Sequence, residues 1–113
     1  MLIFPLKKQW YEKIKSGEKT IEYREVKDYW TRRLQRAEFR DGGGHWDFDK
    51  KLWIFDDFSA PCILQLGYTK ERLEAWIDKL EIVDGKDTDL HIDKPVYAIH
   101  LADVKEGDNY GTF

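Results

Sequence analysis

The chain has 113 residues, of which 42% are hydrophobic and 15% aromatic, and it carries a formal net charge of -3 at pH 7. This length and apolar content predict a single domain over residues 1–113 with one core, and exclude a disordered or fibrous chain. No stretch approaches the ~18 uncharged apolar residues of a membrane span, and the N-terminal residues lack the basic flank of a signal peptide, so we expect no membrane partner.

The N-terminal segment predicts a strand followed by a helix. Residues 2–4 form an apolar run closed by Pro5, which is typical of a short buried strand. Residues 7–16 then have helical spacing, and Trp10 and Ile14 are expected on the buried face because they lie four residues apart. Gly17 can adopt a positive φ and therefore ends the helix.

The segment from Gly17 to Arg24 combines cations, carboxylates, a phenol and a guanidinium. Its polar and apolar residues alternate as in a half-buried strand, so Glu22 and Arg24 should share one face. On an exposed face such an ion pair would contribute only about 0 to 1 kcal/mol. In a regular strand Lys19 and Glu22 would lie on opposite faces, so a contact between them requires Lys19 to sit in the turn before the strand.

A second helix is predicted from Tyr29 to about Ala37, with Asp28 as its N-cap and with Trp30 and Leu34 on its buried face. Its remaining surface carries three arginines, Arg32, Arg33 and Arg36. Residues 24–40 contain six cations against three acids. Arginines on an exposed helix face are usually only solvated, and this excess strengthens the alternative of a ligand-facing basic stripe.

Charge is unevenly distributed along the chain. Residues 1–40 hold 11 Lys and Arg against 6 Asp and Glu, a net charge of +5, whereas residues 41–113 hold 8 against 16, a net charge of -8. A basic segment in an acidic protein suits a local phosphate site and disfavours promiscuous binding along a duplex. The two segments can also interleave in the fold, in which case the asymmetry has no spatial meaning.

Residues 40–60 are expected to form an insertion-like loop that begins at a glycine-rich run. Aromatic residues are interspersed with acids in this segment, namely Trp46, Phe48, Trp53, Phe55 and Phe58. The pattern is compatible with a strand pair, a short helix or a lid. His45 has no partner at metal-ligand spacing, so we expect no zinc site.

Residues 62–68 predict a strand that ends at Gly67 and Tyr68. Its Cys62 is the only cysteine of the chain, so no intramolecular disulfide can form, and we expect a reducing, cytoplasmic compartment. A lone cysteine in an apolar strand is expected to be a core residue and not a nucleophile.

The segment from residue 73 to residue 82 fits two structures. Its apolar residues have helical spacing at Leu73, Trp76, Ile77 and Leu80. As a strand, the same segment alternates up to Ile77 and then shifts phase, which requires a bulge near Asp78 and Lys79.

The last segments are a polar turn over residues 84–89 and a strand over residues 96–104, with Tyr97, Ile99 and Leu101 on one face. The turn holds three aspartates but lacks the glycine position and the closing glutamate of a calcium loop. The sequence contains no phosphate-binding glycine loop, Walker motif or serine nucleophile elbow. We therefore expect neither a metal nor a cofactor.

The run from Ile14 to Arg24, with Tyr29-Trp30 and Arg33-Leu34 after it, resembles the signature of the ASCH superfamily. Residues 66–68 and 95–101 are similar to later core strands of that family. The resemblance implies an α+β fold, a small PUA-like β-barrel of about five or six strands with two short N-terminal helices. It also favours the strand over the helix for residues 73–82.

The same resemblance implies a role connected with RNA or nucleosides. The wider family is regarded as RNA-binding, one branch is an N4-acetylcytidine amidohydrolase, and another is a ribonuclease. The amidohydrolase branch uses a lysine at the position of Lys19, a threonine at the position of Glu22, and a later glutamate. This chain keeps the lysine, has glutamate in place of the threonine, and offers no clear counterpart of the later glutamate.

Three functions stay open on these grounds. The first is binding of single-stranded RNA, a nucleoside or a nucleotide in a basic, aromatic cleft. The second is metal-independent hydrolysis, with Glu22 as the general base and Lys19 or Arg24 as its electrostatic partner. The third is a protein-partner module. The expected catalytic residues are Lys19, Glu22 and Arg24, and the expected substrate-binding residues are Tyr23, Trp30, Arg33 and Tyr68.

Overall fold

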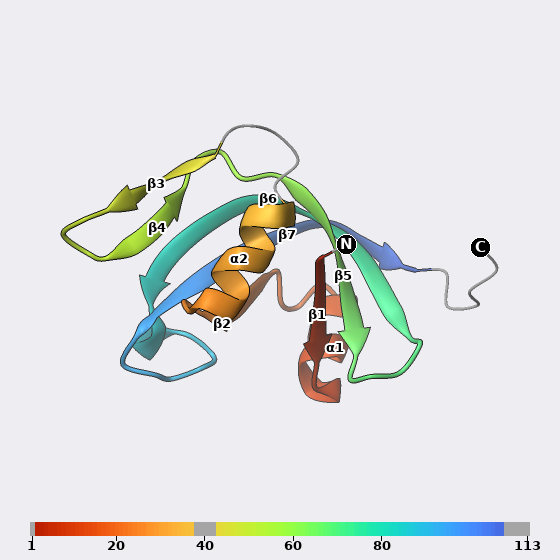
Figure 1. Cartoon of the computed structure of the whole chain (residues 1–113). Coiled ribbons are helices and arrows are strands. Elements are labelled where there is room, and N and C mark those ends of the chain that lie inside the picture. The colour runs from red at the N-terminus through yellow and green to blue at the C-terminus, as the bar shows by residue number, and fades with distance from the viewer. Residues whose placement is uncertain (1, 38–42, 108–113) are drawn as a thin grey trace.

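The computed structural model describes residues 2–37 and 43–107 (Figure 1). In chain order its elements are β1 (Leu2–Leu6), α1 (Lys8–Lys15), β2 (Ile21–Glu25), α2 (Asp28–Ala37), β3 (Gly44–Asp47), β4 (Leu52–Phe55), β5 (Ala60–Leu66), β6 (Arg72–Asp84), a 3-10 turn (Gly85–Asp87) and β7 (Pro95–Glu106). The fold is α+β and has two short helices near the N-terminus, which confirms the predicted class.

Five strands form one curled, mixed sheet in the order β1-β5-β6-β7-β2. β1 pairs with β5 in parallel, and the other neighbours are antiparallel. Figure 1 shows the sheet arching into a half-barrel, with β1 and β2 as its two edges. Arg24 on β2 donates a 2.8 Å hydrogen bond from Nη2 to the carbonyl oxygen of Pro5 on β1, and so links these edges. A proline is suited to an edge strand because it has no N–H to donate.

Both helices pack their apolar faces onto the sheet, but α1 is turned differently from the prediction. Tyr11 and Ile14 are its buried residues, three positions apart on one face. Trp10, expected on that face, is instead half-buried at its edge, where the ammonium groups of Lys13 and Lys19 each lie 5.3 Å from the centre of its ring. In α2, Trp30 and Leu34 are buried as predicted.

The helix α2 begins at Asp28, which was expected as its N-cap. A carboxylate in the first turn still interacts favourably with the positive end of the helix dipole. Trp30 stacks on Phe4 of β1, with the ring centres 5.1 Å apart, and this contact fixes α2 against the sheet edge. The predicted buried residues Tyr97, Ile99 and Leu101 of β7 belong to the same core.

The ambiguous segment at residues 73–82 is a strand. β6 pairs with both β5 and β7, so backbone hydrogen bonding on two sides overrides the helical spacing of its apolar residues. Its register against β7 shifts between Ile77 and Lys79, which confirms the bulge expected near Asp78. A second shift lies between Glu74 and Trp76, and the sequence analysis did not anticipate it.

Most of the segment expected as an insertion-like loop is a β-hairpin. β3 and β4 pair in register from Gly44 opposite Phe55 to Asp47 opposite Leu52, and Figure 1 shows the hairpin projecting from one end of the molecule. Residues 40–42 of that predicted loop lie outside the described residues. The hairpin is anchored by Phe55 and by the following Phe58, which are both buried in the core.

Candidate functional site

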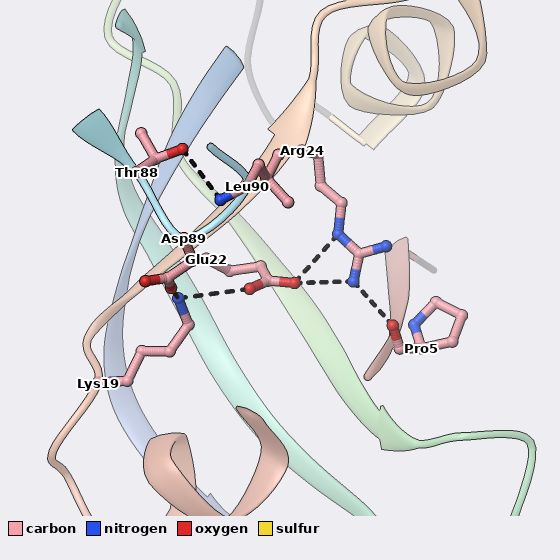
Figure 2. A network of polar contacts seen from close by, with 7 residues as sticks. All are labelled: Pro5, Lys19, Glu22, Arg24, Thr88, Asp89 and Leu90. Carbon is pink, nitrogen blue, oxygen red and sulfur yellow. Dashed lines mark hydrogen bonds and ion pairs between the residues drawn. The ribbon is translucent and has the colours of Figure 1, made fainter. Parts of the chain in front are cut away.

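The carboxylate of Glu22 is the centre of an ionic cluster at the start of β2. Glu22 is only 6% exposed, and Oε2 accepts hydrogen bonds from Nη2 of Arg24 at 2.8 Å and from Nε at 3.1 Å. Oε1 lies 3.7 Å from Nζ of Lys19. Figure 2 shows the two cations on opposite sides of the carboxylate. Lys19 reaches Glu22 because it precedes Ile21, the first residue of β2, as the sequence analysis required.

Arg24 is held flat between the carboxylate and two aromatic rings. Its guanidinium carbon lies 4.9 Å from the ring centre of Trp30 and 5.4 Å from that of Phe4, and its Nη2 also donates to Pro5. Such stacking favours a planar cation. No residue of the described ranges accepts a hydrogen bond from its third nitrogen, Nη1.

Lys19 is enclosed on the other side of Glu22. Its ammonium group lies 4.9 Å from the ring centre of Tyr23 and 5.3 Å from that of Trp10, and it also contacts the carboxylate of Asp89. The side chain of Lys19 is only 9% exposed. Two carboxylates and two ring faces therefore surround a single buried ammonium group, which is how buried cations are stabilised in proteins.

Asp89 is held against Lys19 by the turn that precedes it. The buried hydroxyl of Thr88 donates to the carbonyl oxygen of Gly85 at 2.9 Å and accepts from the backbone N–H of Leu90 at 3.2 Å. A Cβ on Gly85 would lie 2.6 Å from the carbonyl oxygen of Lys94, so only glycine allows the chain to close this tightly. Figure 2 shows Thr88, Asp89 and Leu90 beside the ionic cluster.

The ionic cluster lines a cleft of about 440 Å³. Its aromatic and apolar walls include Pro5 of β1, Trp10 of α1, Tyr23 of β2, Trp30 of α2 and Leu90 of the loop before β7. The charged lining residues are Lys7, Arg24 and Lys27 against Glu22, Glu25 and Asp89. Lys7 and Lys27 are exposed, so their charges lie at the rim of the cleft, whereas the charges of its interior compensate one another.

The phenol of Tyr23 is a neutral wall of this cleft. Burial raises its pKa, and the nearby carboxylates of Asp89 and Glu81 act in the same direction. Tyr23 therefore keeps its proton at neutral pH and can donate a hydrogen bond. Its ring face is covered on one side by the ammonium group of Lys19. The lining of the cleft thus includes a phenol, a guanidinium and the ammonium groups of Lys7 and Lys27.

The structure brings five of the seven predicted site residues together. Lys19, Glu22, Tyr23, Arg24 and Trp30 lie in or directly beside the cleft. Arg33 instead lines a separate groove on the other side of Pro5, because it projects from α2 one turn beyond Tyr29. Tyr68 lies in the turn after β5, is 92% exposed, and is absent from the lining of the cleft. The structure therefore does not bring Arg33 and Tyr68 into the cleft with the other five residues.

Several lining residues of the cleft were not predicted for the site, and they include Lys7, Trp10, Lys27 and Asp89. The two lysines belong to the basic N-terminal segment, whose charge was a usable signal. Trp10 was assigned to the core because it satisfies the helical spacing. Asp89 had no local signal, since it is 70 residues from its partner Lys19 in the chain.

The described residues, 2–37 and 43–107, contain no group of three His, Cys, Asp or Glu side chains placed to hold a metal ion. Within the same ranges no helix is long and apolar enough to cross a membrane. Comparison of the chain with protein-family models, with curated proteins and with solved structures gave no significant match.

Proposed function

We propose that the chain is an ASCH domain with a PUA-like fold that binds single-stranded RNA or a nucleotide in the cleft. The observation that carries the proposal is the guanidinium of Arg24, which lines the cleft, stacks on Trp30, pairs with Glu22 and has no acceptor for Nη1 among the described residues. The curled sheet, the two N-terminal helices and the run Lys19 to Arg24 at the cleft support the family assignment. The arrangement suits a planar, polar, weakly charged group in the interior.

A nucleotide matches this distribution of groups. A base can stack on an aromatic ring such as Trp10 and hydrogen-bond to Arg24, while its phosphate lies at the rim near Lys7 and Lys27. The compensated interior disfavours a phosphate at the bottom of the cleft, because Glu22 and Asp89 would repel it. The proposed orientation therefore places the base inside and the phosphate outside.

Titration of a fluorescently labelled RNA hexanucleotide, followed by anisotropy at several salt concentrations, tests the proposal. Trp10→Ala should weaken binding about 5- to 150-fold, the equivalent of about 1 to 3 kcal/mol for one stacked base. Lys27→Ala should reduce the slope of log K against log salt by about 0.7, the value for one phosphate contact of a single strand.

Two variants serve as matched controls. Trp46→Ala removes an exposed tryptophan of the hairpin, and Lys70→Ala removes an exposed lysine of the turn after β5. Neither residue lines the cleft. Equal losses in Trp10→Ala and Trp46→Ala would show that the RNA binds elsewhere, and absence of binding by the unmodified protein would refute the proposal.

Hydrolysis is the second candidate, and one contact favours it. Lys19 bridges Glu22 and Asp89, which places an ammonium group between two carboxylates at the cleft wall. In the hydrolytic reaction Glu22 is proposed as the general base, and Lys19 as the group that stabilises the oxyanion. Both oxygens of Glu22 already face cations, whereas Asp89 is the more exposed carboxylate and is an alternative base.

Incubation with N4-acetylcytidine and with single-stranded RNA, without added metal, distinguishes these roles. Glu22→Gln should lower the rate about 10²- to 10⁴-fold if Glu22 is the base, and Asp89→Asn should do so if Asp89 is. If the protein only binds, Glu22→Gln should leave RNA affinity unchanged or raise it, because a negative charge is lost. No turnover of either substrate by the unmodified protein would exclude these two reactions.

A further inference from the structure

A second concave surface lies between β1 and α2 and adjoins the cleft. We name it the arginine groove. It has a volume of about 640 Å³ and is lined by Ile3, Pro5, Tyr29, Arg33, Arg36 and Pro61, together with two further apolar residues. Pro5 lines both the groove and the cleft. The two surfaces are therefore neighbours along the same sheet edge.

The charge of the arginine groove differs from that of the cleft. Its charged lining residues are Arg33 and Arg36, and no acidic side chain of the described residues lines it. Among residues 2–37 and 43–107, no carboxylate forms an ion pair with either arginine. Within the described residues the groove thus carries two positive charges and no negative one, whereas the charges lining the cleft balance. An anionic group gains more from the groove than from the cleft interior.

The geometry of Arg33 also favours nucleic acid. Its guanidinium carbon lies 3.7 Å from the ring centre of Tyr29, which is half-exposed. A stacked guanidinium is held flat, and a flat guanidinium can donate two parallel hydrogen bonds to a phosphate or present its other face to a base. Arg36 lies beside it, one position short of a full helical turn, and adds a second donor group.

The aromatic residues connect the two surfaces. Tyr29 lines the groove and Trp30 lines the cleft, and their rings meet edge to face with the centres 4.9 Å apart. Trp30 in turn carries the guanidinium of Arg24, and Tyr29 carries that of Arg33. Two stacked arginine–aromatic pairs therefore stand next to each other, one for each surface, and both of their aromatic rings belong to α2.

We propose that the arginine groove holds the phosphate and base that adjoin the nucleotide in the cleft, so that the chain recognises a single strand and not an isolated nucleotide. This proposal rests on the proposed function, because it names a second subsite for the same ligand. The strand passes over Pro5, from the charge-balanced cleft to the groove. The cleft selects the shape of one base, and the groove supplies salt-dependent affinity through Arg33 and Arg36.

A length series tests the second subsite. Uridine 5′-monophosphate and oligouridylates of two, four and six nucleotides are titrated by calorimetry, and the same series is repeated with cytidylates. We expect the affinity to rise at least tenfold between one and four nucleotides. The double variant Arg33→Ala/Arg36→Ala should abolish this gain, reduce the salt slope for the tetranucleotide by about 0.7 for each lost phosphate contact, and leave the affinity for the mononucleotide unchanged.

Arg32→Ala is the matched control, because Arg32 is an exposed arginine of the same helix that lines neither the groove nor the cleft. It should keep the length dependence. Equal affinities for one and six nucleotides would overturn the second subsite while the proposed function stands. If the gain in affinity with oligonucleotide length survives in the double variant, or is lost equally in Arg32→Ala, the second subsite does not lie in the arginine groove. Absence of binding by every probe would overturn both proposals.

Discussion

At the residue scale, the charge of Glu22 joins three parts of the chain. Its buried carboxylate contacts Lys19 from the turn before β2 and Arg24 from β2, and Arg24 continues to the backbone of β1. Buried ions are costly to remove from water, and their mutual attraction offsets this cost only while every partner is present. The cluster therefore stabilises the half-barrel as a unit.

We predict that Glu22→Ala lowers the free energy of unfolding by about 3 to 5 kcal/mol, because it removes the carboxylate that pairs with Arg24 and one of the two carboxylates that contact Lys19. Urea denaturation followed by circular dichroism measures the effect. The control is Glu106→Ala, which breaks the ion pair with Lys15, whose partners are 37% and 71% exposed, and which should cost at most about 1 kcal/mol. Equal losses in the two variants would contradict the role of Glu22.

At the element scale, the turn from residue 85 to residue 92 determines whether Asp89 belongs to the site. We predict that Gly85→Ala weakens the contact between Asp89 and Lys19, because the added Cβ meets two backbone oxygens, those of Ile92 and Lys94, at 2.7 and 2.6 Å. Neither of these backbone oxygens can move away unless the whole turn shifts. The cost in stability should reach about 1 to 3 kcal/mol, as for overpacking elsewhere, and amide hydrogen exchange should increase over residues 88–92.

Gly17→Ala is the comparison for that variant. Gly17 has φ of +86°, and a Cβ there would meet no atom within 4 Å. Its cost is therefore backbone strain alone, about 1 to 2 kcal/mol, with no change in exchange over residues 88–92. A pattern of exchange that is the same in both variants would show that Gly85 does not hold the turn.

The elements show where sequence reasoning succeeds. The bulge in β6 followed from a shift in the alternation of apolar residues at Ile77, because alternation reflects which face of the sheet is buried. The orientation of α1 could not be predicted from the sequence. Trp10 and Tyr11 are adjacent aromatic residues, and either one can lie on the buried face of the helix together with Ile14. The tertiary environment selects between them, because Lys19 and Tyr23 form a polar site into which a partly exposed tryptophan fits.

At the scale of the whole molecule, the candidate site combines residues that are distant in sequence. The run Lys19 to Arg24 was predictable as the centre, because its charge and aromatic content exceed what an exposed strand needs. The contribution of Asp89 and the separation of Arg33 from Arg24 were not predictable from the sequence. Both depend on how the sheet curls and on where α2 crosses β1. Long-range packing, and not local spacing, divides the basic residues into the cleft and the arginine groove.

The buried acids of the core predict a loss of stability at alkaline pH. Burial raises the pKa of the Cys62 thiol from 9.0 to about 12. Burial likewise raises the pKa of Tyr97, although its hydrogen bond with Thr31 opposes the shift, and the pKa of Tyr11 is raised chiefly by burial. Above pH 9 the unfolded chain releases the thiol proton while the folded chain retains it. The contribution of the protonated Cys62 thiol to the free energy of unfolding is thus fully present below pH 9 and is lost as the pH rises toward 12.

Cys62→Ala isolates this effect because tyrosines ionise at higher pH than an ordinary thiol. Between pH 9 and 10 the free energy of unfolding of the unmodified protein should fall by about 1 kcal/mol more than that of Cys62→Ala, the amount expected for one group with an unfolded pKa near 9. Urea titrations of both proteins at half-unit steps of pH measure the difference.

Parallel curves for the two proteins over this interval would mean that the thiol is reached by water in the folded state, and rapid reaction of the native protein with a disulfide reagent would then be expected. Slow reaction in buffer and fast reaction in urea is the outcome that accords with a buried thiol on β5, the strand between β1 and β6 in the sheet.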